Sequence, residues 1–448
     1  MKLKAVFTEK DSPMYRYTVF LKWLAISIPV GLAVGIAGSL FHILLDKVTE
    51  FRQENSFVIF LLPIAGLLIV LLYKALGMDH DKGTNGIIMG ARGEHEVSAK
   101  LAPLIVLSTL LTHLCGGSAG REGAALQLGG SLVSPLSKWC RLDEEDTSML
   151  IMCGMSAGFS ALFGTYAAAA VFAIEVTIVG MTRYSAIVPC IISSLTAGMV
   201  ASFFKVQPTA FMVRLIPEFD AASEMVMICT ILMGIACAVI SIVFCKVITG
   251  VKGLYKKYFP NPYIRVAVGG VIVAAISYVL FLLTGQYDYN GAGTDIIRLA
   301  FQGGSRPEAF VIKLLLTALT LGAGFKGGEI VPSMFVGATF GCFFGNLLGL
   351  SPSFGAALGL AAVFCGVTNC PFASLILSVE LFGEKGLPYY ALAIGLSYML
   401  SGYSGLYSAQ KFMDNKYIHG GLSGILSYKE LKEKLRRRSD EKITDRKD

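Results

Sequence analysis

The sequence predicts an all-α integral membrane protein built from two related halves. Composition, long apolar segments and an internal repeat all support this prediction. Of the 448 residues, 54% are apolar and 15% are charged, whereas a soluble domain carries about 25% charged residues. The formal net charge of +7 comes almost entirely from the ends, because residues 1–22 and 429–448 each carry +3. This composition excludes a soluble enzyme, a disordered chain and a nucleic-acid binder with a basic face.

Long apolar segments alternate with short polar stretches along the chain. A helix needs about 20 residues to cross a bilayer, and several segments are too short or too long for one crossing. Segment 101–115 ends in a glycine cluster, and segment 353–382 contains Asn369 and Pro371. We therefore expect broken or re-entrant helices, whose free backbone groups must face protein or water. The candidate segments are 19–45, 57–77, 101–115, 148–179, 184–204, 225–247, 264–284, 309–324, 332–350, 353–382 and 387–401.

The charged ends predict how the chain lies in the plasma membrane. Five basic residues precede or open the first segment, and Arg436, Arg437 and Arg438 lie in the tail. Under the positive-inside rule both termini are cytoplasmic, which implies an even number of crossings. We expect a cytoplasmic N-terminal segment at 1–22, a first membrane repeat at 23–215, a second at 216–415 and a short cytoplasmic tail at 416–448.

Cysteine and histidine patterns suggest no metal site or cofactor. The ten cysteines form no C-x-x-C pair and mostly lie in apolar runs, as buried small hydrophobic residues do. The five histidines are scattered without metal-ligand spacing.

An internal repeat is the most informative feature. Three blocks recur in the same order at nearly one offset, and Glu122 and Glu329 are 207 residues apart (122 to 329). Duplicated halves with matching interruptions point to a transport site at the repeat interface. The pattern leaves parallel and inverted repeats open, and an odd number of crossings per half would invert them. The paired blocks are Gly83-Thr-Asn85-Gly86 with Asn290-Gly-Ala-Gly293, Gly120-Arg-Glu122-Gly123 with Gly327-Gly-Glu329-Ile330-Val331-Pro332, and Phe172-Ala-Ile-Glu175 with Leu377-Ser-Val-Glu380.

The two glycine–glutamate blocks predict an anion site. In the first block, glycines allow a sharp turn and close approach of a ligand, and the following residues start a helix. The unpaired N–H groups of that first turn attract an anion without a full positive charge. The same argument applies to Gly327–Val331, with Pro332 suited to the first helical turn. Two such helix ends can converge on one dehydrated anion.

The glutamates in these blocks are candidates for gating and proton coupling. A carboxylate costs at least about 3 kcal/mol at the bilayer centre, but at a helix N-terminus Glu122 mimics the transported anion. Unprotonated, it would fill the site, and protonated, it would leave. Alternatively, Glu122 caps its own helix. Glu329 either relays protons, contributes to the site indirectly, or lies with Lys326 at the surface of a vestibule.

Four further side chains have two readings each. Asn85 is either an N–H donor to the anion or an ordinary turn residue. Tyr407 is either an O–H donor to the anion or an interfacial anchor. Glu175 and Glu380 each end an apolar helix, which favours packing or capping.

These motifs together resemble the CLC family of anion channels and proton-coupled anion exchangers. The blocks around Glu122, Glu329, Asn85 and Tyr407 are similar to that family's glycine-rich blocks in order and spacing, over about residues 20–415. The resemblance implies an inverted-repeat helical fold and a homodimer with one anion pathway per subunit. It also implies that Glu122 is the gating glutamate and that Asn85, Gly123, Ala124, Ile330 and Tyr407 line the anion site.

Departures from the family pattern bear on the transported ion. Asn85 stands where most members have serine, Glu329 lies inside the second block, and Val176 falls where exchangers have an internal proton-transfer glutamate. The first two features are similar to the fluoride-exporting branch, although Val331 replaces its threonine. The family at large favours chloride.

The leading hypothesis is a halide transporter in the lipid bilayer that moves chloride or fluoride coupled to protons and has no enzymatic activity. A passive voltage- or pH-gated chloride channel is the alternative. An intramembrane enzyme would need a nucleophile–base pair, for which Ser118 near His113 is the nearest candidate. A structural scaffold would not need the matched glycine–glutamate breaks.

Overall fold

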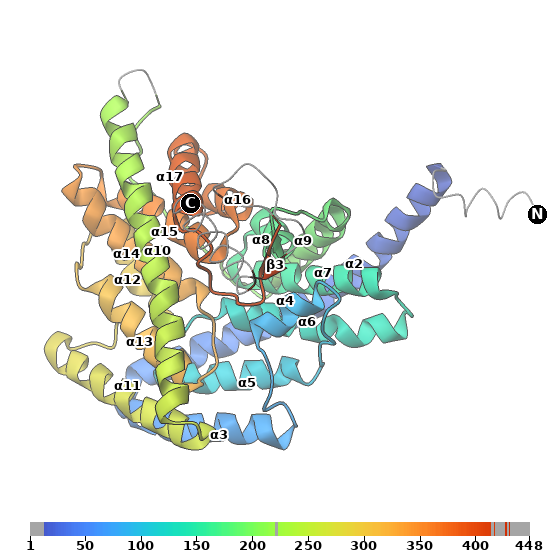
Figure 1. The fold of residues 1–448 in the computed structure, drawn as a ribbon, viewed down its shortest axis with the longest axis horizontal. Helices are drawn as coiled ribbons and strands as arrows, with labels where there is room; N and C mark the ends of the chain where they lie inside the picture. Colours follow the sequence, from blue (N-terminus) through green and yellow to red (C-terminus); the bar gives the residue numbers. More distant parts are fainter. Residues whose placement is uncertain (1–12, 220–222, 414–415, 417–425, 428–429, 431–448) are drawn as a thin grey trace, which may run out of the picture.

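The computed structural model describes residues 13–219, 223–413, 416, 426–427 and 430. The expected N-terminal segment lies outside this part as far as residue 12, as does most of the expected tail, including Arg436–Arg438. The described chain is almost entirely helical (Figure 1). Its elements are α2 Pro13–Glu54, η1 Ser56–Leu61, α3 Leu62–Ala75, α4 Thr84–Gly90, α5 Leu101–Leu114, α6 Glu122–Trp139, α7 Glu144–Phe163, α8 Tyr166–Glu175, β1 Ile178–Val179, η2 Tyr184–Ala186, α9 Ile187–Phe203, α10 Glu224–Tyr258, α11 Pro262–Thr284, α12 Thr294–Phe301, α13 Ala309–Ala323, α14 Ile330–Leu347, α15 Pro352–Thr368, α16 Pro371–Phe382, α17 Leu387–Leu400, β2 Lys411–Phe412 and β3 Leu426–Ser427.

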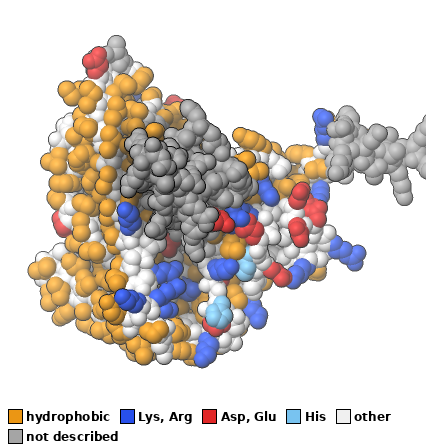
Figure 2. All heavy atoms as spheres, in the orientation of Figure 1, with side chains coloured by type: hydrophobic (Ala, Val, Ile, Leu, Met, Phe, Trp, Pro, Cys, Tyr) orange, Lys and Arg blue, Asp and Glu red, His pale blue; other side chains and the backbone are white. Residues whose placement is uncertain are grey.

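Long apolar helices account for the membrane-spanning character of the chain. Within the described residues, seven helical spans are long and apolar enough to cross a bilayer. Figure 2 shows apolar side chains covering the side of the molecule formed by α10 and α11, whereas charged side chains gather toward α4, α6 and α7. Exposed Ile228, Val239, Val271 and Leu282 lie on α10 and α11. A broad exposed apolar surface of this kind suits lipid rather than water.

The two halves contain matching runs of four helices. Helices α5 to α8 have 14, 18, 20 and 10 residues, and α13 to α16 have 15, 18, 17 and 12. Apolar segments 148–179 and 353–382 each form two helices. Asn369 ends α15 in the left-handed conformation and Pro371 starts α16, so the expected break is confirmed. Gly164 ends α7 in the same way, with φ +70°.

Glycine contacts hold the central helix pairs of each half together. Gly129 of α6 packs on the backbone of Gly154 of α7, and in the second half Gly337 of α14 packs on the carbonyl of Gly359 of α15. Because lipid gives no hydrophobic drive between helices, close packing of small residues must stabilise such pairs. The first turns of α6 and α14 therefore rest on closely packed supports.

Two glutamates cap each other's helices across the halves. The Glu175 carboxylate, at the end of α8, accepts hydrogen bonds from the N–H groups of Phe372 and Ala373 (3.2 and 2.8 Å). At the corresponding place Glu380, near the end of α16, accepts from Ala167 and Ala168 of α8 (2.9 and 3.0 Å). Carboxylates at helix N-termini satisfy unpaired N–H groups and complement the helix dipole. The expected capping role of Glu175 and Glu380 is confirmed.

Candidate functional site

The two repeats meet at a pair of glycines just before α6 and α14. Gly120 and Gly328 form a two-residue antiparallel bridge, in which each N–H donates to the other's carbonyl at 2.7 Å. The backbones approach so closely that a Cβ atom on Gly328 would lie 2.6 Å from the nitrogen of Gly123. The glycines of both blocks therefore bring the two helix N-termini together, as the sequence predicts.

Glu122 is the first residue of α6 and is fully buried. One carboxylate oxygen, Oε2, accepts hydrogen bonds from the N–H of Arg121 (3.0 Å) and from the N–H of Val331 (3.3 Å). Val331 lies in the first turn of α14. The carboxylate thus binds across the repeat interface to the N-terminus of the opposite helix, where an anion would be held.

Backbone N–H groups of both first turns remain available for an anion. The first helical bond of α6 runs from Ala125 N–H to Arg121 (3.0 Å), and that of α14 from Ser333 N–H to Glu329 (3.2 Å). The N–H groups of Gly123, Ala124 and Ile330 precede these bonds and have no acceptor within their own helix. All three residues are buried, which strengthens their interaction with a desolvated anion.

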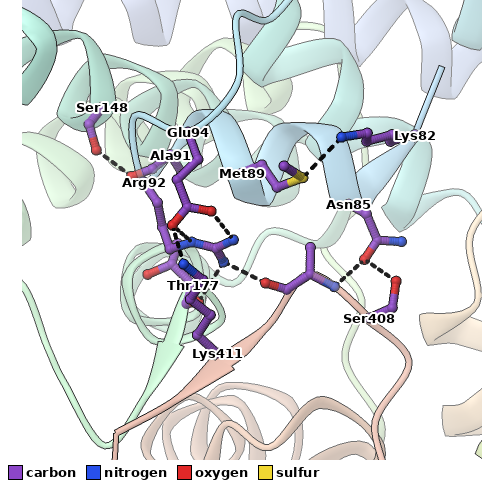
Figure 3. A network of polar contacts seen from close by, with 11 residues as sticks. Lys82, Asn85, Met89, Ala91, Arg92, Glu94, Ser148, Thr177, Ser408 and Lys411 are labelled. Carbon is purple, nitrogen blue, oxygen red and sulfur yellow. Dashed lines mark hydrogen bonds and ion pairs between the residues drawn. The ribbon is translucent and has the colours of Figure 1, made fainter. Parts of the chain in front are cut away.

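Asn85 contacts the segment that directly follows Tyr407. The Asn85 carbonyl oxygen Oδ1 accepts from the N–H of Ala409 (2.9 Å) and from the hydroxyl of Ser408 (3.4 Å). Figure 3 shows the Asn85 side chain reaching from α4 toward Ser408. Because a backbone N–H can only donate, it fixes which amide atom faces Ala409 and leaves the Nδ2 donors of Asn85 free of this contact. Tyr407 itself is buried, with 4% of its surface exposed.

Gln127 of α6 connects the start of α4 to the first turn of its own helix. Gln127 Nε2 donates to the Thr84 hydroxyl (3.0 Å) and to the carbonyl of Gly123 (3.1 Å). Gln127 was not among the site residues predicted from the sequence. Its signal was a lone amide in the otherwise apolar run Ala124–Leu128, since a buried amide needs hydrogen-bond partners.

A large cavity opens next to Arg121. It has a volume of about 870 Å³, and charged and polar side chains line it, among them His42, Asp46, Arg121 and Arg298. Arg121 Nη1 lies 3.0 Å from His42 Nδ1, and His42 Nε2 lies 3.2 Å from an oxygen of Asp46. These contacts of His42 were not predicted from the sequence, because His42 lies 79 residues before Arg121. Arg121, the residue before Glu122, lines this polar cavity.

Glu329 immediately precedes α14. The Lys326 ammonium lies 4.0 Å from the centre of the Tyr73 ring.

Two other residues named from the sequence have defined places. Val176 is fully buried directly after α8, and the neighbouring Glu175 uses both carboxylate oxygens to cap α16. Ser118 bonds to Tyr289 and Thr317, whereas His113 Nδ1 bonds to the carbonyl of Thr109. The suggested Ser118–His113 pair of an enzyme is therefore not formed.

Comparison with known proteins gives one consistent result. The family profile for voltage-gated chloride channels matches residues 65–402. A chloride/fluoride channel protein of Pseudomonas syringae pv. tomato is 34% identical over 401 residues, covering 88% of each chain. An H(+)/Cl(-) exchange transporter of Vibrio cholerae serotype O1 is 26% identical, covering 80% of this chain and 81% of its own.

Solved structures agree with the fold. The crystal structure of a CLC-type fluoride/proton antiporter superposes with a TM-score of 0.83 at 31% identity, covering 88% of this chain and 98% of that chain. A slow cyanobacterial Cl-/H+ antiporter superposes with a TM-score of 0.73 at 19% identity, covering 85% and 94%. The expected fold, an all-helical inverted repeat with broken helices, is confirmed.

Proposed function

Because the chain belongs to the voltage-gated chloride channel (CLC) family, we propose that it exchanges a halide for protons across the bilayer, with Glu122 as the gate. The observation that carries this proposal is the bond from the Glu122 carboxylate to the Val331 N–H across the repeat interface (3.3 Å). The carboxylate binds the α14 N-terminus through Val331, the residue next to the Ile330 N–H proposed for the halide, so the two anions would compete for one helix end. Protonation would weaken the carboxylate as an acceptor, so proton binding and halide entry are linked at this helix end.

The anion would lie between the two helix N-termini. The N–H groups of Gly123, Ala124 and Ile330 would hold it from the backbone, and the Nδ2 of Asn85 and the hydroxyl of Tyr407 would hold it from side chains. Glu329 lies one residue before α14, at the helix end that Glu122 binds. It would be the second proton-carrying carboxylate.

Fluoride is the halide that we favour. The relative at 34% identity is named a chloride/fluoride channel protein, and the structure at 31% identity is a fluoride/proton antiporter. Asn85 and Glu329 are the sequence features that agree with a fluoride carrier. Chloride remains the alternative substrate.

A passive channel is the second candidate mechanism. Val176 is apolar and fully buried, and Glu175 is engaged as a helix cap. A proton path on this side of the site would therefore have to run through another group. A channel on the same fold would need no such path.

Efflux from proteoliposomes distinguishes these proposals. Fluoride and chloride efflux would be measured with and without a pH gradient for the wild type, Glu122→Gln and the control Glu96→Gln, whose side chain is exposed in a surface ion pair. We expect an imposed pH gradient to drive fluoride uphill in the wild type and in the control, but not in Glu122→Gln. If no halide moves against its own gradient in the wild type, the exchanger proposal fails and the channel remains.

We also propose a homodimer in the plasma membrane with both termini cytoplasmic. The basic ends of the chain support the orientation of the termini, and the dimer is the assembly that the family resemblance implies. Light scattering of the detergent-solubilised protein would measure the mass of the assembly, and a monomeric mass would contradict the dimer.

A further inference from the structure

Both backbone polar groups of Ala409, two residues after Tyr407, are hydrogen-bonded to side chains. Its N–H donates to Asn85 Oδ1 (2.9 Å), and its carbonyl accepts from Arg92 Nη1 (2.6 Å). Asn85 is the proposed amide donor to the anion, and Tyr407 is the proposed hydroxyl donor. The backbone of one residue therefore connects Arg92 to Asn85 through hydrogen bonds and to Tyr407 along the chain.

Arg92 is itself fixed by several groups (Figure 3). Its guanidinium binds Glu94 through two bonds (3.0 and 2.7 Å), and Nη1 also donates to the carbonyl of Thr177 (3.1 Å). Only 5% of the Arg92 side chain is exposed. Lys411 of β2 donates to the same Glu94 (2.6 Å).

These contacts join three distant segments. Arg92 follows α4, Thr177 follows α8, and Ala409 lies 317 residues after Arg92 in the loop before β2. Strands β1 and β2 pair in parallel next to this point, with Ile178 opposite Lys411. The planar fork of a guanidinium can bind a carboxylate and two carbonyls at fixed angles, which a lysine ammonium cannot reproduce.

We propose that Arg92 is a positioning residue that sets the Asn85 amide and the Tyr407 hydroxyl in register for the halide. Arg92 acts through the backbone of Ala409 and does not contact the ion. This inference rests on the proposed function, because it takes Asn85 and Tyr407 as donors to the anion. Loss of Arg92 would free the Ala409 carbonyl, loosen the hydrogen bond to Asn85 and weaken halide binding.

A double-mutant cycle on halide binding tests the proposal. Fluoride affinity would be measured by calorimetry for Asn85→Ala, Arg92→Ala and the double variant, with Lys138→Ala as control. Lys138 forms an ion pair with Glu96 in which both side chains are 78% exposed, so its loss should have little effect. We expect Arg92→Ala to weaken binding about tenfold, which corresponds to about 1.4 kcal/mol. The double variant should bind less weakly than the sum of the two single effects predicts, because only the part of the Arg92 effect that acts through Tyr407 then remains.

The outcomes separate two failures. If Asn85→Ala leaves fluoride affinity unchanged, the proposed anion site is wrong. If Asn85→Ala weakens binding but Arg92→Ala does not, or if the two effects simply add, the positioning role of Arg92 is overturned.

Two milder variants guard against a folding defect. Arg92→Lys keeps the charge but not the fork, so we expect it to restore only part of the affinity. Glu94→Gln keeps the guanidinium and its bonds to the Thr177 and Ala409 carbonyls, so its affinity should lie between those of the wild type and Arg92→Ala. Wild-type affinity in Arg92→Lys would contradict the proposal, since a single point charge would then be enough.

Discussion

Replacing Gly328 by alanine tests whether the site depends on the close approach of the two repeats. The new Cβ atom would lie 2.6 Å from the Gly123 nitrogen and 3.1 Å from the Glu122 nitrogen. Ordinary contact begins at about 3.4 Å, so the backbones must separate by about 0.8 Å. The two 2.7 Å bonds between Gly120 and Gly328 lie directly at this point and would be stretched.

The cost can be estimated from this displacement. Overpacking of a close contact typically destabilises a protein by about 1–3 kcal/mol. Misplacement of reacting groups by about 1 Å costs up to about 100-fold in enzymes. By analogy, we expect Gly328→Ala to lower halide turnover by about 10- to 100-fold while the protein still folds.

The assay is halide efflux from proteoliposomes, together with a thermal melt in detergent. Gly250→Ala is the matched control, because Gly250 is exposed on α10 and its added Cβ would meet no described atom within 4 Å apart from its chain neighbours and the backbone of its own helix. It should transport at the wild-type rate. A folded Gly328→Ala protein with wild-type turnover would refute the reasoning, because the helix N-termini would then tolerate separation.

Three further predictions concern topology, pH and capping. Cys140 is the one exposed cysteine of the ten and lies near the start of α7, where Asp146 forms an ion pair with Lys22 of the N-terminal segment that we propose to be cytoplasmic. A membrane-impermeant maleimide should therefore label Cys140 in inside-out vesicles but not in intact cells. The reverse pattern would invert the proposed topology. Hydrogen bonds from Arg92, and secondarily from Lys411, lower the pKa of Glu94 to about 2, so the stability that this carboxylate contributes is complete above the unfolded pKa of about 4.3 and is lost as pH falls toward 2. The difference in melting temperature between wild type and Glu94→Gln should thus be constant from about pH 5 to pH 8 and shrink below about pH 4; a change between pH 5 and pH 8 would contradict this assignment. Glu175→Gln and Glu380→Gln should each destabilise the protein by about 1 kcal/mol, the usual scale for a lost helix cap, and unequal melting temperatures would show that the two caps are not equivalent.

Much of the fold was predictable because its signals are local. Apolar length gave the membrane segments, and Asn369 with Pro371 gave the break between α15 and α16. The repeat gave the capping roles of Glu175 and Glu380. The start of α2 at Pro13 was not predicted, because this helix extends beyond its apolar part into a charged segment.

The centre of the site was also predictable, but its supports were not. Glycines beside Glu122 and Glu329 indicate helix starts in any apolar chain, and the structure brings those starts together. The bond from Arg92 to Ala409 spans 317 residues. No local pattern encodes a contact of that separation, since it depends on how α4, α8 and the last segment pack.

The helix N-termini have a consequence for how transport responds to acid. Amide N–H groups neither gain nor lose protons between about pH 4 and pH 10, unlike the side chains of the titratable residues. The N–H groups of Gly123, Ala124 and Ile330 would therefore bind a halide with the same affinity at acidic and alkaline pH. The whole acid response of the carrier would then rest on the few carboxylates at the site. Glu122 is the one that itself binds a helix N-terminus, through the Val331 N–H, so its protonation would open or close the path.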